Sequence, residues 1–136
     1  MRHLWLVIIG ALAWLVAGHA AFAAQRCTMT GAVKRCESSF GPGKIVTFGE
    51  SSGDVNKMVI DDPNTSVDPE KLAVIVGLTM AKFSPKLTAD DRGEAFKKLL
   101  AIGAKQSKEQ VRLGDWTWGA VWIDKHLTLT LQKRAP

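Results

Sequence analysis

The first 23 residues constrain this chain most, because they have the composition of a secretory signal peptide. Residues 1–3 give a basic start, and residues 4–17 form an apolar core interrupted by one glycine. Ala21 and Ala23 then fit the two small-residue subsites of a signal peptidase. We therefore predict cleavage directly after Ala23, so that residues 24–136 fold as the mature protein in the periplasm or the extracellular space.

The alternative to a cleaved leader is an uncleaved membrane anchor. A spanning helix needs about 20 apolar residues, and the apolar core here has about 14. Residues 20–24 could lengthen it, so the anchor stays a second interpretation. The cleaved form is favoured, and it predicts no stable membrane span in the mature protein.

The charge of the chain argues against a nucleic-acid-binding protein. The formal net charge is +5, and loss of Arg2 with the leader lowers it to +4. The basic residues are scattered and form no run, whereas a nucleic-acid site usually gathers them. A weakly basic protein of this size is expected to be one domain with a modest core, attracted to acidic components of the cell envelope.

Two cysteines, Cys27 and Cys36, remain after cleavage. In an exported chain the expected state of such a pair is a disulfide. It closes a ten-residue loop and is expected to contribute about 2–3 kcal/mol by the loop-entropy argument. A redox-active or metal-binding pair is the alternative, but the close spacing that tunes thiol acidity is missing. We predict a structural staple.

Turn signals and hydrophobic patterns divide the mature chain into strands, two helices and further strands. Gly41-Pro42-Gly43 and Ser51-Ser52-Gly53 are turn sequences, and the segments 44–49 and 55–60 that follow them are rich in β-branched residues. A third strand is predicted around residues 33–38, tied by the disulfide.

Two capping signals predict the helices. Asp68 followed by Pro69 starts the first, which runs to Phe83 with apolar residues almost all round. This composition predicts a deeply buried helix, although residues 74–76 could instead form a buried strand. Thr88 starts the second helix, whose apolar residues recur at spacings of three and four.

The last third returns to strands at residues 109–113, 116–123 and 127–133. The predicted order is therefore β-β-β-α-α-β-β-β. This order is typical of an α+β fold with two layers, in which an antiparallel sheet is covered on one face by two helices.

Trp116, Trp118 and Trp122 share one face of their strand, and that face is either core or a binding stripe. If the following turn consists of residues 124–125, the tryptophans share a face with Leu127, Leu129 and Leu131. If it also includes residue 126, they face outward beside threonines. A two-residue turn at 114–115 likewise groups them with apolar residues, so both turns favour the core.

Other candidate chemistry is weaker. Asp62, Asn64, Ser66 and Asp68 alternate as oxygen ligands do in a calcium loop. However, Val67 stands where an EF-hand needs glycine. Asp61, Asp62 and His126 are the residues that a small secreted hydrolase could use, but no nucleophile motif accompanies them. The sequence therefore predicts no metal and no cofactor.

Taken together, the sequence predicts a small exported protein that binds a protein partner or another component of the cell envelope. The predicted ligand-binding residues are Trp118, Trp122, Arg112 and Lys125, which cluster in sequence around one hairpin. A small secreted hydrolase that uses Asp61, Asp62 or His126 is the alternative.

Overall fold

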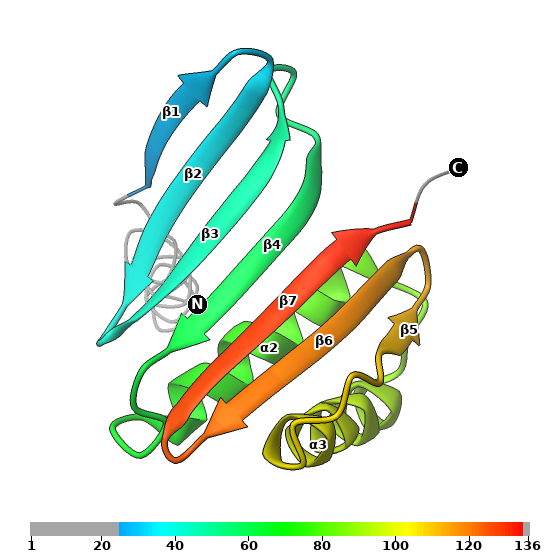
Figure 1. Cartoon of the computed structure of the whole chain (residues 1–136). Helices are drawn as coiled ribbons and strands as arrows, with labels where there is room; N and C mark the ends of the chain where they lie inside the picture. Colours follow the sequence, from blue (N-terminus) through cyan, green and yellow to red (C-terminus); the bar gives the residue numbers. More distant parts are fainter. Residues whose placement is uncertain (1–24, 135–136) are drawn as a thin grey trace, which may run out of the picture.

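The computed structural model describes residues 25–134, so the predicted leader lies outside the described residues. Seven strands form one antiparallel sheet in the order β1-β2-β3-β4-β7-β6-β5, and two helices pack on one of its faces (Figure 1). In chain order the elements are β1 (Arg26–Thr30), β2 (Val33–Phe40), β3 (Gly43–Glu50), β4 (Val55–Asp62), α2 (Pro69–Phe83), α3 (Ala89–Ala104), β5 (Val111–Leu113), β6 (Trp116–Ile123) and β7 (His126–Lys133). The predicted α+β class and two-layer arrangement are confirmed.

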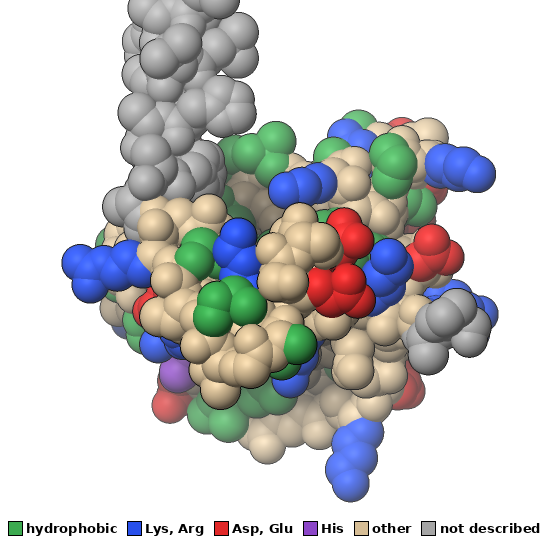
Figure 2. All heavy atoms as spheres, turned by 90° about the horizontal axis from the view of Figure 1, so that it is seen from above, with side chains coloured by type: hydrophobic (Ala, Val, Ile, Leu, Met, Phe, Trp, Pro, Cys, Tyr) green, Lys and Arg blue, Asp and Glu red, His purple; other side chains and the backbone are tan. Residues whose placement is uncertain are grey.

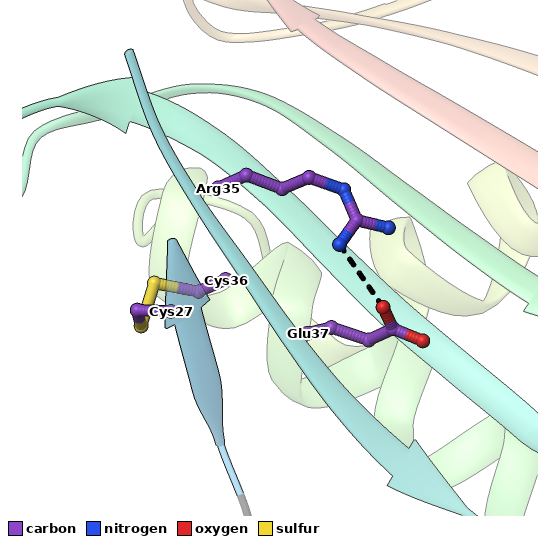
Figure 3. The surroundings of a disulfide bond; sticks show 4 residues. All are labelled: Cys27, Arg35, Cys36 and Glu37. Atoms are coloured by element: carbon purple, nitrogen blue, oxygen red, sulfur yellow. Dashed lines mark ion pairs between the residues drawn. A yellow bond between two sulfur atoms is a disulfide. The ribbon is translucent and has the colours of Figure 1, made fainter. Parts of the chain in front are cut away.

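One strand was not predicted. β1 is an edge strand in which every residue is exposed, so it carries no alternation of polar and apolar side chains. It forms because a tight turn at Gly31, which has a φ of 61°, folds it back onto β2. The predicted disulfide between Cys27 and Cys36 is present and joins these two strands (Figure 3).

Both helices begin at the predicted caps. The Asp68 carboxylate accepts a hydrogen bond from the Lys71 backbone at 3.0 Å, and Pro69 is the first helical residue of α2. At α3, Thr88 and Asp91 form a reciprocal capping box. Residues 74–76 are therefore helical, and the alternative of a buried strand there is wrong.

The prediction that the first helix is buried all round is wrong for one of its faces. Leu72, Ile75, Val76 and Met80 pack against the sheet and are at most 4% exposed. On the opposite side of α2, Val74 and Leu78 are 57% and 56% exposed. The sheet offers only one layer for the helix to cover, so the second apolar face of α2 has no partner within residues 25–134.

The hairpin between β6 and β7 uses the two-residue turn. Ile123 pairs with His126 and Trp122 with Leu127, and Asp124 takes the left-handed φ of 54° that the turn requires. The tryptophans therefore lie on the same face as the leucines of β7, as predicted. This register also points Val121 and Ile123 away from the helices.

Trp118 lies at the centre of the core. Its side chain is 0% exposed and that of Trp116 is 4% exposed, whereas Trp122 is half-buried at the margin of the core. α3 approaches β6 closely at Gly103, where a Cβ atom would lie 3.2 Å from the Cβ of Trp122. The indole nitrogens of Trp118 and Trp122 are buried without an acceptor among the described residues.

We expect Trp118→Ala to lower the free energy of unfolding by about 3–5 kcal/mol, because it empties a large, fully enclosed volume. Val121→Ala is the matched control on the other face of the same strand, and its effect should stay within about 0.5 kcal/mol. Urea unfolding followed by far-UV circular dichroism measures both. Equal midpoints for the two variants would contradict the burial of Trp118.

Candidate functional site

The face of the sheet opposite the helices is covered by no other element of the described chain. Successive side chains of a strand alternate between faces, and the buried Leu127, Leu129 and Leu131 mark the helix side. The strand register then places the alternate residues of β4, β6 and β7 on what we call the helix-free face. Its central members are Val59, Asp61, Thr117, Gly119, Val121, Ile123, His126, Thr128 and Thr130.

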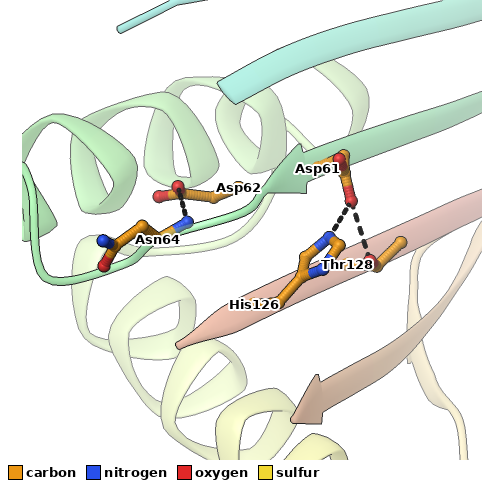
Figure 4. Close-up of polar contacts among 5 residues, drawn as sticks. All are labelled: Asp61, Asp62, Asn64, His126 and Thr128. Carbon is orange, nitrogen blue, oxygen red and sulfur yellow. Dashed lines mark hydrogen bonds and ion pairs between the residues drawn. The ribbon is translucent and has the colours of Figure 1, made fainter. Parts of the chain in front are cut away.

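A polar cluster occupies one end of the helix-free face. Asp61 on β4 lies directly opposite Thr128 on β7, and its Oδ1 accepts hydrogen bonds from the Thr128 hydroxyl at 2.9 Å and from His126 Nε2 at 2.7 Å (Figure 4). The His126 side chain is 53% exposed and that of Asp61 is 23% exposed. The cluster is thus a surface feature that ties two strands together.

The surroundings of Asp61 favour its charged form. Burial raises the pKa of this carboxyl, but hydrogen bonds from His126 and Thr128, with the positive charges of His126 and Lys44, outweigh burial. The net effect lowers the pKa of Asp61 below its usual value. Asp61 is therefore ionised at neutral pH and acts as the acceptor that orients His126.

The structure brings together two of the three residues named for a hydrolase, Asp61 and His126, and separates the third, Asp62. Asp62 is 3% exposed and points to the helix side, away from Asp61, as adjacent strand residues must. The His126 ring forms a hydrogen bond with Asp61, and no serine of residues 25–134 forms a hydrogen bond with that ring. Among residues 25–134, the hydroxyl that shares the Asp61 carboxylate with His126 belongs to Thr128 and not to a serine.

The side-chain oxygen atoms that suggested a calcium loop, from Asp62 to Asp68, form hydrogen bonds within the chain. Asp62 accepts the backbone N–H of Asn64, and the Asn64 side chain accepts both the N–H and the hydroxyl of Ser66. Asp68 caps α2. These bonds account for the pattern as two local turns and a cap. Among the described residues no group of three or more His, Cys, Asp or Glu side chains is placed to hold a metal ion.

Apolar side chains lie beside the polar cluster on the helix-free face. Val121 and Ile123 are 48% and 51% exposed, and the strand register sets Val121 opposite Thr128. Towards β3, Val59 is partly buried and pairs with Val46, which is buried. Gly119 leaves this part of β6 without a side chain. A groove of about 500 Å³ runs here, lined by Gly119, Val121, Thr128, Thr130 and the segment 106–110.

Several cations of the helix-free face form no direct ion pair. Lys44, Lys57 and Arg112 lie on this face, and Lys125 lies in the turn at its end. Within residues 25–134 the ion pairs are Arg35–Glu37 at 3.1 Å and His126–Asp61, so none of those four cations is paired. Figure 2, which views the molecule from one end, shows basic, acidic and hydrophobic side chains intermixed. On the helix-free face the register places Lys57 and Arg112 towards one end and Lys44 and Lys125 towards the other.

The structure separates the four predicted ligand-binding residues. Trp118 is fully enclosed, so its proposed contact with a ligand is wrong: its ring fills the core. Trp122 lies on the helix side and is half-buried. Arg112 pairs with Thr117 at one end of β6, and Lys125 follows the other end, which is about 20 Å away at about 3.3 Å per strand residue. The exposed Val121 and Ile123 were missed, although the same alternation that buries the tryptophans turns them outward.

Comparison with protein-family models, with curated proteins and with solved structures finds no match to this chain. Neither described helix is long and apolar enough to cross a membrane.

We expect Asp61→Asn to lower the free energy of unfolding by about 1 kcal/mol or less at pH 7, because the site is partly exposed. Since the folded pKa of Asp61 is lowered, the native carboxylate contributes stability above its unfolded pKa of about 3.9 and loses it as the pH falls through the folded value. The difference between native protein and variant should therefore shrink towards pH 3. Urea unfolding across this pH range tests it, with the exposed Asp54→Asn as control. A difference that does not change with pH would contradict a role for the charge.

Proposed function

We propose that this protein is exported and binds a partner protein of the cell envelope through its helix-free face. The predicted signal peptide supports export. The disulfide supports it too, because such bonds persist in oxidising compartments and are rare in the cytosol.

The observation that carries the proposed binding is the exposure of Val121 and Ile123 on an uncovered sheet face. Both are about half exposed, whereas the solvent face of a sheet is usually polar. Contiguous exposed apolar surface on a small protein commonly marks a site of association. A partner that covers these residues removes them from water and stabilises the complex.

Charge indicates the chemistry of the partner. Lys57, Arg112 and Lys125 form no ion pair among the described residues, and Lys44 lies opposite Asp61 without a direct ion pair. These four cations lie around the apolar residues, so an acidic protein surface with an apolar centre is complementary to this face. A polyanion would use the cations but leave Val121 and Ile123 uncovered. Arg112 and Lys125 thus remain in the proposal as charges at the rim, and Trp122 does not belong to it.

Capture from a solubilised envelope fraction tests this proposal. The mature protein and two variants are immobilised in turn: Val121→Glu, and as control Val67→Glu, at a valine in the loop before α2 that is also exposed. We expect Val121→Glu to lower the amount of the native protein's captured partner at least tenfold, a loss of about 1.4 kcal/mol, and Val67→Glu to leave it unchanged. Equal capture by all three proteins overturns the proposal, and so does binding that heparin abolishes and Val121→Glu leaves intact.

Export has its own test. We expect mass spectrometry of the protein from the periplasmic or secreted fraction to find Ala24 as the first residue and no free thiol. Recovery of a chain that retains Met1 in the membrane fraction contradicts a freely diffusing protein. Detection of two reactive thiols contradicts the oxidised state.

A further inference from the structure

A row of polar side chains crosses one end of the helix-free face, with one side chain from each of four neighbouring strands. The register pairs Lys57 of β4 with Gln132 of β7. Gln132 in turn pairs with Thr117 of β6, and Thr117 pairs with Arg112 of β5. Their ammonium, amide, hydroxyl and guanidinium groups can all donate hydrogen bonds. We call these four residues the donor row, which is about 14 Å long at about 4.8 Å per strand.

The donor row has no bonding partner within the described chain. The side-chain hydrogen bonds and ion pairs of residues 25–134 on this face lie elsewhere, around Asp61 and between Arg35 and Glu37. Three members of the donor row are exposed and Thr117 is half-buried. The Lys57 ammonium lies 5.9 Å from the centre of the Phe48 ring, a contact that leaves its hydrogens free for an acceptor. The donors are therefore available to a ligand.

The next rows of the helix-free face differ from the donor row in charge. Two residues further along each strand, the nearer row is neutral and consists of Val59, Thr130 and Gly119. In the row after that, Asp61 lies between Lys44 and Thr128. The donor row thus holds two cations and no carboxylate, whereas the charge of Lys44 is offset by the carboxylate opposite it.

Acidic residues near the donor row lie in turns and not in the row itself. Glu50 and Asp54 belong to the turn between β3 and β4, and Asp115 belongs to the turn between β5 and β6. None of the three forms an ion pair with Lys57 or Arg112. They lower the positive potential at this end of the sheet but leave the donors unoccupied.

We propose that the donor row binds the carboxylates of an acidic segment in the partner protein. This inference rests on the proposed binding at the helix-free face and specifies where the partner carries its charge. Ionised carboxylates only accept hydrogen bonds, and the Arg112 guanidinium can hold one of them through two parallel N–H bonds. Thr117 and Val121 are four residues apart on β6, which is about 13 Å. The partner therefore places its carboxylates about 13 Å from the apolar group that covers Val121.

Fluorescence anisotropy of a labelled glutamate decapeptide tests the donor row, with the mature, oxidised protein at low salt, where screening is weak. We expect the double variant Lys57→Gln with Arg112→Gln to weaken binding by about tenfold or more, because it removes both cations of the row. The control is Lys98→Gln with Lys105→Gln, which takes the same charge from exposed positions on α3 and at its end. The control should weaken binding by about threefold or less. Equal losses in the two double variants overturn the donor row, and so does a native protein that does not bind the peptide.

A neutral substitution separates hydrogen bonding from general charge attraction. Gln132→Met removes one amide donor without changing the charge and should weaken peptide binding by about twofold or more. Unchanged binding of this variant overturns the part assigned to the neutral donors.

The donor row and the apolar centre are tested separately. Val121→Ala should leave peptide binding unchanged, and the Lys57 and Arg112 double variant should also lower capture of the envelope partner. If Val121→Glu abolishes capture and the double variant does not, the apolar site is correct and the donor row is wrong. If the peptide needs the donor row but Val121→Glu leaves capture intact, the donor row is correct and the proposed apolar contact is wrong.

Discussion

The pairing of β4 with β7 is the contact on which the rest of the structure depends. It joins the meander β1–β4 to the hairpin β6–β7, which are separated along the chain by both helices (Figure 1). At its centre Ile60 lies opposite Leu129, and the two are 1% and 0% exposed. Because this contact closes a long loop, its entropic cost is recovered only when the helices pack over it. The two halves of the sheet and the helices therefore stabilise one another as a unit.

The same seam creates the polar cluster. Asp61 and His126 are 65 residues apart in sequence and meet only because β4 and β7 are neighbours. No spacing rule within the sequence predicts such a contact, whereas the separation of Asp61 from Asp62 follows from strand alternation alone. The individual residues of the candidate site could thus be named from the sequence, but which of them lie in contact depends on the strand order of the sheet.

Features fixed by neighbouring residues were predicted well. Asp68 and Thr88 cap their helices through bonds that span three residues, and two turns were enough to place the tryptophans inside. Strand β1 was missed because none of its side chains is buried, so its sequence has no apolar alternation that would predict a strand. The exposed face of α2 was missed for another reason: its composition indicates burial, but a pattern of apolar residues does not say whether the covering surface belongs to the same chain.

The disulfide fastens one of the two edge strands of the sheet. β1 has only exposed residues and only one neighbouring strand, so side-chain burial adds little to hold it in place. The covalent bond from Cys27 to Cys36 supplies that hold (Figure 3). While it is intact, the sheet ends in a short strand that begins with a charge, a kind of border that discourages strand-to-strand aggregation. β2, which is longer, lies inside this border and is paired with a strand on each side. The covalent bond thus helps to keep a short, charged strand as the border at this end of the sheet, so that β2 is not left open to pairing with another chain.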